Sequence, residues 1–191
     1  QMEKCGVGQG VRREEAPRLL RGRGLFTNDV NLPNQTYAIM LRSPHAHAEI
    51  RSIDTAAASS APGVQGVFTG ENVAADNLGV PGMPAKWKRP DGEPMKYRPQ
   101  PPLALGRVRY VGDPVALVVA DTLDQARDAA ELIDVDYQDL PSITNTAKTV
   151  DPDAALVWDD SPDNVSGQFQ AGNADAVEAA FANAARIVKR R

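Results

Sequence analysis

Residues 36–54 show two hydrophobic patterns that predict two consecutive β-strands. The run TYAIMLR, residues 36–42, is apolar on both faces and rich in strand-forming residues, so we expect a buried strand. Residues 46–54 instead alternate between apolar and polar side chains, which predicts a strand with only one buried face. Pro44 favours a turn between the two strands. The polar face of the second strand would carry His45, His47, Glu49 and Arg51.

Residues 108–141 predict a strand, a helix and a further strand. The apolar run PVALVVA, residues 114–120, indicates a buried central strand, and we expect Val115, Leu117 and Val119 to form its buried face. Gly112, Asp113 and Pro114 favour a turn or bulge just before this run. Residues 133–141 alternate again and predict another strand. If these two strands were parallel neighbours, the crossover between them would be right-handed.

The helix between these strands has a start signal and one apolar face. Thr122 with Gln125 three residues later has the spacing of a capping box. The apolar face carries Leu123, Ala126, Ala130 and Ile133. We expect Ala126 and Ala130 to pack against the same core as residues 114–120, since small side chains let a helix approach a sheet closely.

Residues 79–106 are rich in proline and lack hydrophobic periodicity, which predicts a long loop. Basic and aromatic side chains gather in this loop: Lys86, Trp87, Lys88, Arg89, Lys96, Tyr97 and Arg98. Two interpretations remain open. The loop is either loosely attached, so that trypsin cuts first at its basic residues, or a docking loop with aromatic and arginine anchors.

The C-terminal part divides into two segments. Residues 146–172 are acidic and rich in turn-forming residues, which is typical of a linker on the surface. A helix then begins at Asn173 or Asp175 and presents an apolar stripe that includes Val177 and Phe181.

Composition narrows the function classes. The 191 residues carry a net charge of -4, and no block of like charge runs past a few residues, so we expect no nucleic-acid partner. No apolar run approaches the ~20 residues that cross a bilayer, and the N-terminus lacks the apolar stretch of a signal peptide, so no membrane partner is expected either. The single cysteine, Cys5, cannot form an internal disulfide, which favours a reducing, cytoplasmic location.

His45 and His47 are the only histidines, and their spacing raises the question of a metal site. Two imidazoles on one strand face can bind zinc when a third ligand joins them, and Glu49 would lie next in the row. Arg51 on the same face disfavours a cation, so we expect a solvated face or a domain contact. The alternative is a self-contained, non-enzymatic binding module that is metal-linked through His45 and His47.

Two blocks of sequence resemble a known family. Residues 21–73 contain RGRGLFTNDV, LRSPHAHAEIRSID and APGVQGVFTGEN in order, and residues 108–143 form the second block. Both are similar to the N-terminal α/β hammerhead domain of the molybdenum hydroxylase large subunit, the family of xanthine dehydrogenase, aldehyde oxidase and aerobic carbon monoxide dehydrogenase. The resemblance implies an α+β fold, a mixed sheet with two to three helices.

The resemblance also implies a division of the chain. Residues 1–20 would be an N-terminal arm, residues 21–145 the hammerhead domain with the long loop 79–106, and residues 146–172 a linker. Residues 173–191 would be a helix and the start of a strand that lead toward the molybdenum-cofactor domain.

The function implied is that of a structural and interface domain, inactive by itself, in an oxidoreductase. In the family, molybdopterin and the catalytic glutamate are held by segments downstream of the region matched here, so we assign no catalytic, cofactor-binding or metal residue to this chain. Its expected partners are the downstream molybdenum-cofactor domains and subunits that carry iron–sulfur clusters and FAD.

Overall fold

The computed structural model describes residues 8, 10, 13–77, 87–98 and 100–190, so Cys5 and Lys86 lie outside the described residues. The chain forms two compact units, Gln1–Thr36 and Tyr37–Arg191. In the described part of the first unit, α1 (Ala16–Leu20) has a proline in its first turn, and η1 (Thr27–Asp29) is a short 3-10 turn. The Asp29 carboxylate accepts a hydrogen bond from the Phe26 N–H over 2.9 Å and so closes the start of that turn.

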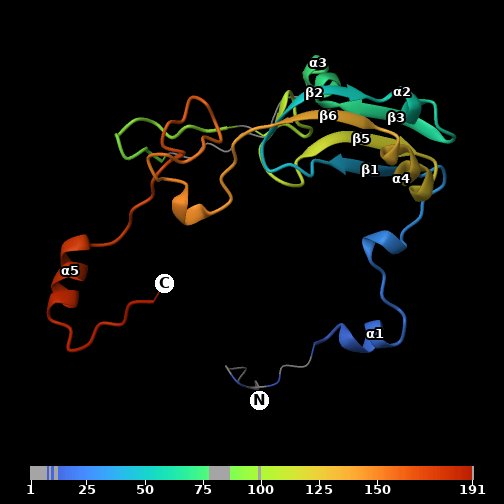
Figure 1. Ribbon diagram of the computed structural model, residues 1–191. Coiled ribbons are helices and arrows are strands. Elements are labelled where there is room, and N and C mark those ends of the chain that lie inside the picture. The colour runs from blue at the N-terminus through green and yellow to red at the C-terminus, as the bar shows by residue number, and fades with distance from the viewer. Residues whose placement is uncertain (1–7, 9, 11–12, 78–86, 99, 191) are drawn as a thin grey trace. The chain divides into compact units, whose positions relative to one another are not determined.

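The second unit contains the strands and the remaining helices (Figure 1). In chain order they are β1 (Tyr37–Arg42), β2 (Ala48–Asp54), α2 (Ala56–Ser59), β3 (Val64–Thr69), α3 (Gly70–Ala75), β4 (Arg107–Val108), β5 (Pro114–Ala120), α4 (Leu123–Glu131), β6 (Asp134–Asp139), η2 (Thr146–Lys148) and α5 (Ala174–Ala182). The strands predicted at residues 36–42, 46–54, 114–120 and 133–141 are therefore confirmed.

The strands form two sheets of three, and every pair of named strands is antiparallel. The β5 sheet has the order β1-β5-β3, and the β2 sheet has the order β4-β2-β6. The α+β hammerhead class is confirmed, but two antiparallel sheets stand where one mixed sheet was expected. Helix α4 connects β5 of one sheet to β6 of the other sheet. Val118 of β5 and Val135 of β6 therefore pack on the same core. The two strands are therefore not parallel neighbours.

Helix α4 begins as its sequence predicts. The Thr122 hydroxyl accepts a hydrogen bond from the Gln125 N–H over 3.2 Å. Ala126, Ala129 and Ala130 are buried against the β5 sheet. Small side chains on this face let the helix lie close to the strands, and the predicted contact of Ala126 and Ala130 with the core is confirmed.

The buried face of β5 toward this helix differs from the one predicted. It consists of Ala116, Val118 and Ala120, each with no exposed surface, whereas Leu117 and Val119 are only half-buried. Every residue in the run is apolar, so periodicity offered no means of choosing between the faces. Val115 is buried, but it belongs to a second core cluster with residues of the β2 sheet.

Two short helices, α2 and α3, had no counterpart among the predicted elements. Helix α3 begins at Gly70, where a side chain would collide with the Ala104 carbonyl oxygen, because an added Cβ would lie 2.2 Å from that atom. This close approach joins α3 to the segment that precedes β4. Glycine is the residue that permits it.

In the described part of the long loop, basic side chains bond to acidic groups of this chain, and the predicted early cleavage at those residues stays a prediction. Arg89 is 7% exposed and forms an ion pair with Asp163 over 2.8 Å. Lys96 donates a hydrogen bond to the Asp160 carbonyl oxygen, and Arg98 pairs with the carboxylate of the same residue. The loop docks on residues 157–168 of its own chain, because those residues carry the acidic groups that its basic side chains require.

Helix α5 begins after Asn173, whose side chain accepts a hydrogen bond from the Ala176 N–H, as one of the two predicted starts requires. Its stripe residues Val177 and Phe181 are exposed. Residues 183–190 form no strand in the part of the chain that the structure describes.

Candidate functional site

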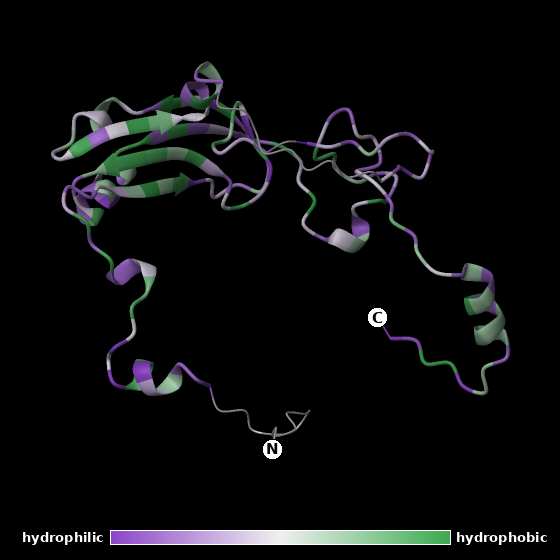
Figure 2. Ribbon diagram, turned by 180° about the vertical axis from the view of Figure 1, so that it is seen from behind, coloured by the Kyte–Doolittle hydropathy of each residue, from purple (hydrophilic) through white to green (hydrophobic). Residues whose placement is uncertain are grey.

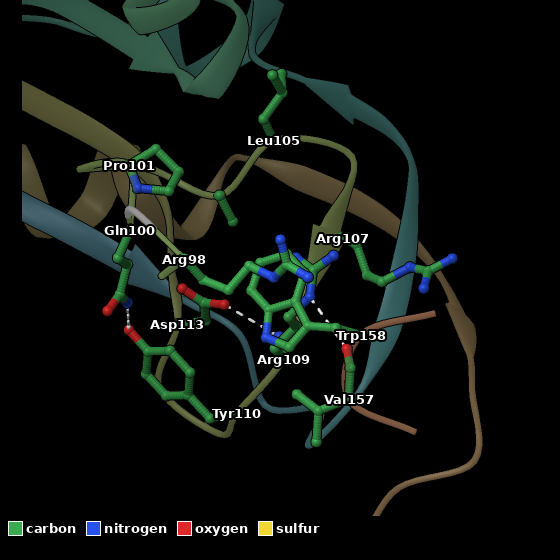
Figure 3. Close-up of a pocket in the computed structure, with 11 residues that line it drawn as sticks. Arg98, Gln100, Pro101, Leu105, Arg107, Arg109, Tyr110, Asp113, Val157 and Trp158 are labelled. Carbon is green, nitrogen blue, oxygen red and sulfur yellow. Dashed lines mark hydrogen bonds between the residues drawn. The ribbon is translucent and has the colours of Figure 1, made fainter. Parts of the chain in front are cut away.

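A pocket of about 320 Å³ opens beside β4 in the second unit (Figure 3). The charged and aromatic side chains that line it are Arg98, Arg107, Arg109, Tyr110, Asp113 and Trp158. Strand alternation places the two central arginines: Val108 points into the core with no exposed surface, so Arg107 and Arg109 both face the other way.

A turn after β4 fixes Arg109. The Arg109 N–H donates to the Asp113 carboxylate over 3.0 Å, and the Asp113 N–H donates to the Tyr110 carbonyl over 3.1 Å. Gly112 takes a positive φ of 91° at the bend, a conformation that favours glycine. The turn predicted before residues 114–120 is therefore confirmed, and it forms the floor of the pocket.

Trp158 is presented by a loop that one asparagine holds together. Asn164, with φ 54°, accepts from the Val157 N–H and donates to the Thr149 and Ala155 carbonyls, all over 3.0 Å. Asparagine tolerates this left-handed conformation better than most residues. The segment predicted as a surface linker is thus closed on itself where it meets the pocket.

Two guanidinium groups contact the Trp158 indole. The Arg109 guanidinium carbon lies 3.6 Å from the ring centroid, and that of Arg98 lies 5.2 Å away. The Arg109 Nε also donates to the Val157 carbonyl over 3.3 Å. Figure 3 shows these side chains converging on the indole from the loop and from the β4 turn.

Arg107 links the pocket to a strand and to the acidic segment. Its guanidinium contacts both Asp159 carboxylate oxygens over 3.1 Å and the Glu49 carboxylate over 3.1 Å. Arg107 Nη1 is shared between the two Asp159 oxygens, and its Nη2 donates to Glu49, so one guanidinium joins two carboxylates. Glu49 therefore pairs with an arginine of the pocket and does not line up with the histidines.

The electrostatics of the pocket favour clamping over acid–base chemistry. Burial, followed by the charge of Arg107, lowers the pKa of Arg109. Burial, followed by the Asp113 carboxylate, raises the pKa of the Tyr110 phenol, so this group stays protonated at neutral pH. An arginine does not exchange protons in this range either. The arrangement holds residues 157–160 against the β4 turn.

The histidines also act as a clamp. They precede β2 instead of lying within it, and His47 is 7% exposed, so the predicted solvated face is wrong for this residue. The His47 Nδ1 lies 2.8 Å from the Pro141 carbonyl oxygen, and the His45 Nδ1 lies 2.6 Å from the Asp139 carboxylate. Both rings therefore hold the end of β6. The register between β2 and β6 shifts around Arg51, and the Arg51 guanidinium donates to the Gln138 side-chain oxygen over 2.7 Å.

Sequence reasoning missed Arg107, Arg109 and Trp158 as a group. Arg107 and Arg109 alternate around the buried Val108, which was a usable local signal, but Trp158 lies in a segment without periodicity.

No set of three or more His, Cys, Asp or Glu side chains gathers as a metal cage among the described residues. Within those same ranges, no helix has the length and apolar character needed to cross a membrane.

Residues 21–141 match the family described as "Aldehyde oxidase and xanthine dehydrogenase, a/b hammerhead domain". The matched range contains both sheets, helices α2 to α4 and the β4 turn that forms the floor of the pocket. Trp158 and its loop lie outside it.

Similar proteins are much longer than this chain. The nicotine 6-hydroxylase large subunit of Paenarthrobacter nicotinovorans is 38% identical over 182 residues, which is 95% of this chain and 21% of that protein. The chain spans about a fifth of the length of the curated relatives that it matches most extensively.

Solved structures support the fold. Reconstituted CO dehydrogenase from Oligotropha carboxidovorans has a TM-score of 0.71 and 31% identity, over 95% of this chain and 23% of that chain. Quinoline 2-oxidoreductase from Pseudomonas putida 86 has a TM-score of 0.65 and 40% identity, over 78% of this chain and 18% of that chain.

Proposed function

Because the chain belongs to the aldehyde oxidase and xanthine dehydrogenase a/b hammerhead family, we propose that it is a structural and interface domain of a large subunit and is inactive by itself. The large subunit would be that of a molybdopterin-dependent hydroxylase or a carbon monoxide dehydrogenase. The observation that carries this proposal is the family match over residues 21–141 in a chain that spans 21% of a hydroxylase large subunit.

The chemistry of the pocket supports an inactive role. A molybdopterin would need free cationic or amide donors for its phosphate and pterin. Among the described residues, each pocket arginine already contacts groups of this chain: Arg98 pairs with Asp160, Arg107 pairs with Asp159, and Arg109 donates to the Val157 carbonyl and stacks on Trp158, although the buried Arg98 Nε has no partner. Because these cations are held within the chain, we assign no cofactor to this pocket and derive no reaction step through one.

The activity therefore belongs to the larger assembly. We expect an oxidoreductase that uses molybdopterin held by other domains of the large subunit, with iron–sulfur clusters and FAD in partner subunits. We place this assembly in the cytoplasm, on the cysteine usage of the sequence. The role of the present chain would be to pack between those parts through surfaces that its own residues leave uncovered.

Two measurements test the proposal. The purified 191-residue chain is assayed with purines, aldehydes and carbon monoxide in the presence of an electron acceptor, and its molybdenum content is measured. We expect neither turnover nor stoichiometric molybdenum. The large subunit encoded by the reading frame that contains this chain, purified with its partner subunits, is the matched sample and should show both. Turnover by the short chain, or a complete protein without molybdenum, would contradict the proposal.

A further inference from the structure

Strand β5 is apolar on both faces, but only the face toward α4 is buried along its whole length. Its run PVALVVA contains no charged residue, a composition typical of strands covered on both sides. In the structure α4 covers Ala116, Val118 and Ala120. On the opposite face Val115 is buried in the second core cluster, whereas Leu117 and Val119 are half-buried and belong to neither core cluster of described residues.

The neighbouring strands extend this uncovered face. In the antiparallel register, Met40 of β1 and Phe68 of β3 both lie opposite Leu117, and Ala38 lies opposite Val119. We call Ala38, Met40, Phe68, Leu117 and Val119 the outer face of the β5 sheet. Met40 is 41% exposed and Phe68 is 42% exposed. In Figure 2 the strands of this sheet are mostly hydrophobic.

The outer face has the features of a contact surface. Its residues come from all three strands of a rigid sheet and carry no charge. The Phe68 ring occupies the space beside Gly66, where an added Cβ would be 3.0 Å from the nearest ring carbons. A contiguous exposed apolar patch on a sheet marks a site of association, and depletion of charge marks the centre of an interface.

We infer that the outer face of the β5 sheet is the docking surface for an apolar, uncharged surface of the remaining part of the large subunit. The relatives supply the argument for this occupant: the matched chain is 21% of one large subunit and 23% of another, so most of such a polypeptide lies outside this domain. This inference rests on the proposed function and assigns a specific surface to the interface role.

The test measures protection of Met40 against oxidation. Methionine reacts with peroxide according to its exposure, so coverage slows the formation of its sulfoxide. Met40 sulfoxide is followed by mass spectrometry in the 191-residue chain and in the complete large subunit purified with its partners. We expect oxidation at least about tenfold slower in the complete subunit.

Two charge variants sharpen the test. Phe68→Glu places a carboxylate on the outer face and should remove the protection of Met40 and lower the yield of assembled enzyme. Gln138→Glu, the matched control, adds the same charge beside Arg51 on the other sheet and should leave both unchanged. Thermal melts of the 191-residue variants check that each one folds, because both positions are exposed in the short chain.

The outcomes separate the two proposals. Equal oxidation of Met40 in a molybdenum-loaded, active enzyme would overturn the docking surface and leave the proposed function intact. Dimerisation of the short chain that Phe68→Glu abolishes would also overturn it, by assigning the face to a second copy. A complete protein without molybdenum or turnover would contradict the proposed function, yet a protected Met40 in it would still support an occupant on this face.

Discussion

The two sheets of this domain present opposite chemistry on their outer faces. The β5 sheet exposes Met40 and Phe68, whereas the β2 sheet exposes Asp134, Asp136 and Gln138 of β6. Both sheets bury aliphatic side chains on their inner faces, so the difference does not arise from the core. A face that meets water carries polar groups, and an apolar face of a stable sheet requires a cover.

The edges of the sheets show the same contrast. Strand β6 lies at the edge of the β2 sheet, and its repeated aspartates discourage pairing with another strand. Strand β1 lies at the edge of the β5 sheet and carries only one charge, Arg42, at its end. This contrast agrees with the docking surface that we infer for the β5 sheet.

The largest expected effect distinguishes the two faces of β5 itself. Val118→Asp places a carboxylate in the alanine-lined core and should destabilise the domain by about 4 kcal/mol or more, because no described group there can pair with the charge. The adjacent Val119→Asp points to the outer face and should cost less than about 2 kcal/mol. Urea denaturation of both variants measures the difference, and equal losses would disprove the assignment of faces.

An intermediate effect is expected from overpacking between α4 and the inner face. Ala126→Leu adds volume at a fully buried position of the core that α4 shares with the strands and should cost about 1–3 kcal/mol. Arg127→Ala on the exposed side of the same helix is the control and should change the free energy of unfolding by no more than about 0.5 kcal/mol. A neutral Ala126→Leu variant would show that the helix does not pack closely on the sheet at this position.

A smaller effect is expected on the outer face. Full burial of Leu117 would make Leu117→Ala cost ~2–5 kcal/mol, but its half-buried position lowers the expected cost in the short chain to about 1 kcal/mol. Chemical denaturation of the 191-residue protein provides the measurement. A loss above ~2 kcal/mol would mean that this chain itself covers the face.

The smallest effect belongs to the outer face of the β2 sheet. Asp136→Ala removes an exposed carboxylate opposite Ser52 and should change stability by no more than about 0.5 kcal/mol. The same denaturation experiment checks it. A clear loss would reveal a structural role for this charge and weaken the contrast between the sheets.

The sequence by itself determined the elements with a strong local signal. Strand β5 and helix α4 follow from an apolar run and a threonine cap, because both depend on interactions within a few residues. The resemblance of residues 21–73 and 108–143 identified the hammerhead class, which the family match confirms.

The candidate site could not be predicted in the same way. Arg109 meets Trp158, and Arg107 meets Asp159, only because an asparagine-centred loop returns across about 50 residues of chain, a distance at which periodicity carries no information. His47 became buried for a similar reason: its partner, the Pro141 carbonyl, follows a strand that lies far from it in sequence.

The tertiary structure also decided which face of β5 is inside and which sheet β6 joins. An apolar run is equally hydrophobic on both sides, so only the position of the alanines of α4 selects Val118 over Leu117 for the core. The connection from β5 through α4 could have led to a parallel neighbour of β5 or to a strand of the other sheet. The packing of the α4 alanines decided this, since they bring β5 and β6 to one core. Local pattern therefore determined the elements of this protein, and long-range packing decided their partners.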